Sequence, residues 1–79
     1  MSPTILLYKN YRFFFNSREE TRMHVHVATP DGTAKYWLEP IVSLADYYNM
    51  PSKELKELMI IVEGKKDDFI DERERHFIQ

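Results

Sequence analysis

The sequence predicts an α+β fold, in which a small antiparallel sheet of three or four strands in two hairpins packs on a C-terminal helix or helix pair. Three observations lead to this prediction. β-branched and aromatic runs fill the first half of the 79 residues, an Asp-Gly pair separates two alternating runs, and apolar residues recur at helical spacing near the end. We expect one domain over residues 1–79, with a sheet half over 1–44 and a helical half over 45–79.

The first hairpin is predicted to join residues 4–8 and 11–15. Between them lies Lys9-Asn10, and Asn tolerates the positive φ that a two-residue turn requires. In the second run three aromatic residues alternate with Arg12 and Phe14, which therefore point to the opposite face. The polar residues 16–22 follow, and we expect them to form a surface loop.

Residues 23–29 and 34–39 are predicted to form the second hairpin, with Asp31-Gly32 as the two central residues of its turn. Pro40 should then end the strand pairing, because proline cannot donate to the ladder. A short edge strand is expected over 41–44, and a helical turn or irregular connection over 45–50.

A helical stretch is predicted from about residue 52 to residue 77. Ser52 or Asn49 can cap its start, whereas Gly64 either divides it into two helices or is tolerated within one. Its apolar stripe, at spacings of three, four and seven, consists of Leu55, Leu58, Met59, Val62, Phe69, Ile70 and Phe77.

The second hairpin should separate polar from apolar side chains. With Asp31-Gly32 in the turn, opposed residues have numbers that sum to 63, so His26 lies opposite Trp37 and His24 opposite Glu39. One face is then expected to carry His24, His26, Lys35, Trp37 and Glu39. The other face is expected to be core and to carry Val25, Val27, Tyr36 and Leu38.

His24 and His26 are the most informative pair, since positions i and i+2 of a strand lie about 6.5–7 Å apart on one face. Zinc requires a third ligand, which here could only be Glu39 or the distant His76, so we predict no metal and no other cofactor. The remaining alternatives are two half-exposed surface histidines, or a general acid and base tuned by the Glu39 carboxylate.

Cationic and aromatic residues of the first half could hold single-stranded RNA, with Arg12 and Lys35 on phosphates and Trp37 stacked on a base. Further candidates are Lys9, Arg18, Arg22, Tyr8 and Phe14. The alternative is that the aromatic residues are core and the arginines a solvated rim. The net charge of −2 disfavours a dedicated duplex-binding module.

The chain has no cysteine, no basic start followed by a long apolar run, and no stretch of about 20 apolar residues. We therefore expect a cytoplasmic protein that does not enter a membrane. A chain of this size has a small core, so a homodimer or another partner subunit is a further expectation.

Several segments together resemble a small prokaryotic family of domains of unknown function, number 4160. They are 1–6, 11–17, His-Val-His-Val at 24–27 and Ala-Lys-Tyr-Trp-Leu-Glu-Pro at 34–40, with similarity at 44–45 and 53–55. The chain departs from the family at Met23, where members often have Pro, at Lys9-Asn10, where Gly is common, and at Pro51-Ser52, where the order is reversed. The resemblance implies a component of a toxin–antitoxin pair with a small cognate partner.

Two functions are therefore predicted. In the first, a toxin-like protein cleaves RNA without metal, with His24, His26 and Glu39 as the acid–base residues and Arg12, Lys35 and Trp37 as RNA contacts. In the second, a non-enzymatic module, acting as an antitoxin or adaptor, docks a small partner protein through its sheet. The residues do not decide whether the protein is an enzyme.

Overall fold

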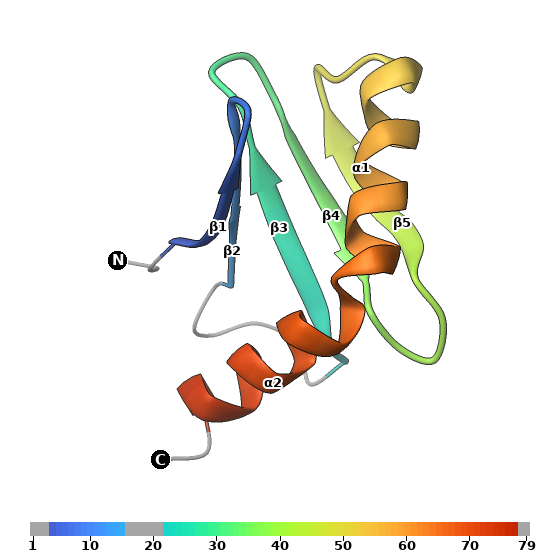
Figure 1. Ribbon diagram of the computed structural model, residues 1–79. Helices are drawn as coiled ribbons and strands as arrows, with labels where there is room; N and C mark the ends of the chain where they lie inside the picture. Colours follow the sequence, from blue (N-terminus) through green and yellow to red (C-terminus); the bar gives the residue numbers. More distant parts are fainter. Residues whose placement is uncertain (1–3, 16–21, 78–79) are drawn as a thin grey trace.

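The computed structural model describes residues 4–15 and 22–77 (Figure 1). Five strands form one antiparallel sheet in the order β1-β2-β3-β4-β5, and two helices follow them in the chain. The elements are β1 (Thr4–Tyr8), β2 (Tyr11–Phe14), β3 (His24–Ala28), β4 (Thr33–Trp37), β5 (Ser43–Tyr48), α1 (Ser52–Gly64) and α2 (Lys66–Phe77). The predicted α+β class is confirmed, with five strands in place of three or four.

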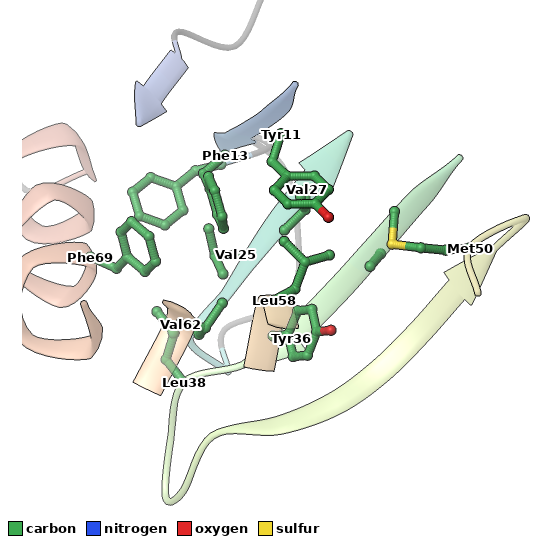
Figure 2. Packing of buried hydrophobic residues seen from close by; sticks show 12 residues of the cluster. Tyr11, Phe13, Val25, Val27, Tyr36, Leu38, Met50, Leu58, Val62 and Phe69 are labelled. Atoms are coloured by element: carbon green, nitrogen blue, oxygen red, sulfur yellow. The ribbon is translucent and has the colours of Figure 1, made fainter. Parts of the chain in front are cut away.

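The core lies between the sheet and the two helices. Strand alternation directs Phe13, Val25 and Tyr36 to this side, where α1 contributes Leu58 and Val62 to the same core. Each such side chain contributes roughly 1.5–3 kcal/mol on full burial. Figure 2 shows the cluster between the two layers, which comprises Tyr11, Phe13, Phe15, Val25, Val27, Ala34, Tyr36, Leu38, Met50, Leu58, Val62 and Phe69.

The first hairpin has its predicted two-residue turn, because Tyr8 pairs directly with Tyr11. The positive φ is at Lys9 (55°), one residue before the predicted position at Asn10. The loop predicted over 16–22 lies, except for Arg22, outside the described residues.

The second hairpin turns one residue earlier than predicted, at Pro30-Asp31. Its flanking residues are Thr29 and Gly32, joined by a hydrogen bond of 2.9 Å from the Thr29 amide to the Gly32 carbonyl. Proline supplies the φ that the first central position of a turn requires. The Thr29 hydroxyl accepts hydrogen bonds from the amides of Asp31 and Gly32, at 3.2 and 3.0 Å.

This turn changes the strand register but not the faces. His24 pairs with Trp37 and His26 with Lys35, so opposed numbers sum to 61 and the predicted sum of 63 is wrong. Because the difference is two residues, each side chain keeps its predicted face. Glu39 lies beyond the end of β4 and is not opposite His24.

Strand β5 occupies part of the segment for which a helical turn was predicted. It runs over Ser43–Tyr48 at the edge of the sheet, so the edge strand predicted over 41–44 is present but starts and ends later, and the prediction of a helical turn or irregular connection over 45–50 was wrong. The ladder to β4 shifts by one residue between Lys35 and Tyr36, which a bulge at Ala45 explains. The bulge interrupts the alternation by which a strand is recognised.

The predicted helical stretch is two helices, which separate at Lys65. The amide of Lys65 bonds the carbonyls of Ile61 and Val62, at 3.0 and 3.2 Å, which closes α1 directly after Gly64. Neither predicted cap is present, because Pro51 occupies the N-cap position of α1 without a side-chain bond. After the break α2 turns across the sheet toward the β1–β2 hairpin, and Phe69 stacks on Phe13 with ring centroids 5.6 Å apart (Figures 1 and 2).

Tyr36 is expected to make the protein sensitive to alkali. Its fully buried hydroxyl donates to the carbonyl oxygen of Leu55 at 2.8 Å, and burial raises the pKa of Tyr36 to about 12 from 10.0. The unfolded chain ionises first, so the stability from this group is complete below pH 10.0 and is lost as the pH rises through about 12. Tyr36→Phe should cost about 1 kcal/mol at neutral pH.

Urea unfolding of both proteins at neutral and at alkaline pH checks this prediction. The wild-type free energy of unfolding should fall more steeply above pH 10.0 than that of Tyr36→Phe. Equal slopes would contradict the role given to this phenol. Other tyrosines contribute equally to both proteins and cancel in the comparison.

Candidate functional site

The side of the sheet that faces away from the helices carries most of the predicted functional residues. Strand alternation places there the side chains that lie between the core positions of β2, β3 and β4. We call this surface the open face; it consists of Arg12, Phe14, Arg22, His24, His26, Lys35 and Trp37.

Four rings form a continuous row across the open face. Phe14 stacks on His26 with centroids 5.4 Å apart, because the two residues pair between β2 and β3. His26 meets the edge of His24 at 5.0 Å, and His24 meets the edge of Trp37 at 5.7 Å. The row therefore runs diagonally from β2 to β4.

Three cations are held over the two ends of this row. The Arg12 guanidinium lies 4.5 Å from the Phe14 ring centroid, while Arg22 and Lys35 lie 4.2 and 4.6 Å from that of Trp37. Such contacts contribute about 0.5–1 kcal/mol each at exposed sites. Their main effect is to restrict long, mobile side chains to one surface.

Hydrogen bonds further orient the two arginines. The Nε atom of Arg12 donates to the Thr4 hydroxyl at 2.6 Å, and that of Arg22 donates to the Glu39 carbonyl at 3.0 Å. Each guanidinium is thus held through Nε and lies over an aromatic ring, an arrangement suited to binding an anion or a base.

His24 is nearly enclosed, with 3% of its surface exposed. Its Nδ1 lies 2.7 Å from the carbonyl oxygen of Arg22. Since a carbonyl oxygen can only accept, Nδ1 carries a proton and the neutral ring presents Nε2 as its acceptor. This histidine contributes a fixed tautomer to the centre of the row.

His26 is half-buried and borders a small pocket of about 140 Å³. In the strand ladders Lys35 lies opposite His26 of β3 and opposite Asp46 of β5. Three titratable residues therefore lie in a line across β3, β4 and β5. The pocket is lined by His26, Thr33, Ala34, Lys35, Asp46, Tyr47 and Tyr48. Sequence reasoning did not find the contribution of Asp46, because the extent of β5 was not predicted.

The structure thus brings together Arg12, His24, His26, Lys35 and Trp37 of the predicted site residues. Glu39 is the exception: its backbone bonds Arg22, and its exposed carboxylate is not in the predicted place opposite His24. The reason is the earlier turn, which moves the partner of His24 from residue 39 to residue 37.

Lys9 and Tyr8, predicted as further RNA contacts, lie away from the open face. Lys9 donates to Glu57 of α1 at 2.6 Å, and Tyr11 donates to the same carboxylate at 3.0 Å. These two bonds lower the pKa of Glu57 and tie the first hairpin to α1. The predicted contact Arg18 and the side chain of His76 lie outside the described residues.

Within the described residues, no group of three or more His, Asp or Glu side chains could hold a metal ion. The helices described here include none with the length and apolar character needed to cross a membrane.

Comparison with known proteins places the chain in a family. Residues 10–72 match the domain of unknown function DUF4160, which spans the second to fifth strands, α1 and the first half of α2. No curated protein and no solved structure matches the chain. The match includes every open-face residue, and the chain therefore belongs to the DUF4160 family.

Proposed function

We propose that this protein binds single-stranded RNA on the open face. The observation that carries the proposal is that Arg12, Arg22 and Lys35 are each held over the ring of Phe14 or Trp37 on one side of the sheet. Phosphates require cations, and unpaired bases stack on aromatic rings or guanidinium planes. The open face offers both within one row of side chains.

The charge distribution along the chain supports the open face as the RNA-binding surface. Residues 1–40 contain five basic and four acidic residues, whereas residues 41–79 contain six basic and nine acidic residues. The excess of acid follows the helical part. Of the described residues on the sheet face opposite the helices, Arg12, Arg22 and Lys35 are cationic and Asp46 is acidic. A single strand fits better than a duplex, because a stacking row reads bases that are not already paired. An RNA ligand agrees with the predicted cytoplasmic location.

Binding of a labelled single-stranded RNA of mixed sequence, measured against salt concentration, tests the proposal. We expect Lys35→Ala to weaken binding several-fold at low salt and to reduce the salt slope by about 0.7, because one phosphate contact is lost. Lys53→Ala is the matched control, since it removes one exposed lysine charge from α1. No binding by the wild type, or equal losses in the two variants, would overturn the proposal.

The pocket beside His26 favours cleavage as a second candidate function. An imidazole next to an ammonium group is a pairing that can act on a phosphodiester. His26 would take the proton of a 2′-hydroxyl, and the 2′-oxygen would bond to phosphorus. The bond between phosphorus and the 5′-oxygen would break, and that oxygen would take its proton from water. Lys35 would stabilise the charge on phosphorus, and the product would be a 2′,3′-cyclic phosphate. Such an activity fits the predicted toxin-like role.

Incubation of RNA with the purified protein and a chelator, followed by analysis of the 3′ ends, tests this candidate. Cyclic phosphate ends formed by the wild type and by Lys53→Ala, but not by His26→Ala, would support it. Induced expression should then arrest growth with the wild type and not with folded His26→Ala. RNA that is bound and stays intact would leave binding alone as the function.

A further inference from the structure

Strand β5 forms an apolar edge of the sheet. It pairs with β4 on one side, and its other side carries no strand among the described residues. Leu44 and Tyr47 are 37% and 54% exposed on the helix side, and Tyr48 is 71% exposed on the open face. The unpaired backbone of such an edge can accept a further strand.

An apolar groove of about 530 Å³ runs beside this edge, between β5 and α1. Its floor includes Leu55 and Met59, and Ile60, 70% exposed, stands at its rim. The other side of α1 contacts the first hairpin, because Lys9 and Tyr11 both donate hydrogen bonds to Glu57. The apolar surface next to β5 is thus continuous with an open strand edge.

We propose that a second copy of this chain covers this surface, with the β5 strands of the two copies paired antiparallel about a two-fold axis. Placing Leu44 opposite Tyr47 of the second copy keeps helix-side residues together, because both face the helix side in the ladder with β4. The same alignment places Ser43 opposite Tyr48 of the second copy on the open face. The two sheets then become one, and the two grooves meet between the α1 helices.

The area available is sufficient for a dimer. The exposed parts of Leu44, Tyr47, Tyr48 and Ile60 amount to roughly 500 Å² in each copy, and the pair would bury about 1,000 Å², the lower limit of a specific interface. Because the contact is isologous, the same apolar side chains are buried in both copies. Asp46, the charged residue of β5, lies opposite Lys35 in the ladder to β4 and therefore on the side of the sheet away from the helices, so it does not enter the apolar groove.

The molar mass in solution, measured by light scattering from low to high micromolar concentration, tests the proposal. The wild type should approach twice 9.5 kDa, whereas Tyr47→Lys and Ile60→Glu should remain monomers with unchanged circular dichroism. Leu7→Lys is the matched control, because Leu7 is 69% exposed on β1 at the opposite edge, and this variant should remain a dimer.

Two outcomes would overturn the dimer. A wild type that stays monomeric throughout would leave the edge to a different protein. Loss of the dimer in Leu7→Lys but not in Tyr47→Lys would move the interface to β1. Neither outcome depends on RNA binding, because the measurement contains no RNA and neither Tyr47 nor Ile60 belongs to the row of rings on the open face.

Discussion

Replacing Gly32 by alanine is expected to lower the free energy of unfolding by about 2–3 kcal/mol, the upper range for overpacking a tight site. A Cβ atom at this position would overlap the backbone carbonyl oxygens of Tyr48 and Asn49. Backbone cannot move away as the end of a flexible side chain can. Asn49 is further fixed, because its side-chain amide donates to the Asp31 carbonyl at 2.8 Å. The turn and the end of β5 must therefore separate or distort.

Gly64→Ala is the matched control for this substitution. A Cβ atom there meets nothing within 4 Å. Gly64 is the last residue of α1, and its φ is not positive. Alanine should therefore leave stability unchanged or raise it by up to about 1 kcal/mol. Urea unfolding of the two variants gives the comparison directly. A Gly32→Ala protein as stable as Gly64→Ala would show that the turn does not pack against β5.

Replacing Trp37 by leucine is expected to weaken the binding of single-stranded RNA by about 10–100-fold, within the range for loss of one stacked base. The ring supports two cations, Arg22 and Lys35, so its removal also frees their side chains. Leucine keeps an apolar group beside His24, and Trp37 is only half-buried. The free energy of unfolding should fall by only about 1–2 kcal/mol.

Binding and urea unfolding of Trp37→Leu should be measured together. Phe13→Leu is a useful comparison, because it alters an aromatic ring of the core on the opposite side of the sheet. That variant should lose stability and keep its affinity for RNA while folded. If Trp37→Leu instead lost stability and bound RNA normally, Trp37 would be a structural residue without a role in binding.

The faces of the second hairpin were predictable from the sequence, whereas its register was not. Alternation places His24, His26 and Trp37 on one side whatever even shift the turn imposes. The choice between Asp31-Gly32 and Pro30-Asp31 depends on the Thr29 hydroxyl and on the packing of Gly32 against Asn49. The second of these is a contact between residues far apart in the chain.

The partners of the open-face residues were less predictable than the residues themselves. Glu39 was placed opposite His24 because the turn was set one residue late. Asp46 was missed because a bulge at Ala45 breaks the alternation of β5. The stacking of Arg22 on Trp37 depends on side-chain directions beyond the end of a strand, which no periodicity describes.

The most direct measurement of RNA binding by the open face is the change in backbone amide NMR shifts when single-stranded RNA is added. The largest changes should fall at Arg12 and Phe14 of β2, at His24 and His26 of β3, and at Lys35–Trp37 of β4. Amides of α1 should change little, because the core separates that helix from the open face. Changes confined to β5 and α1, or none at saturating RNA, would contradict the proposal.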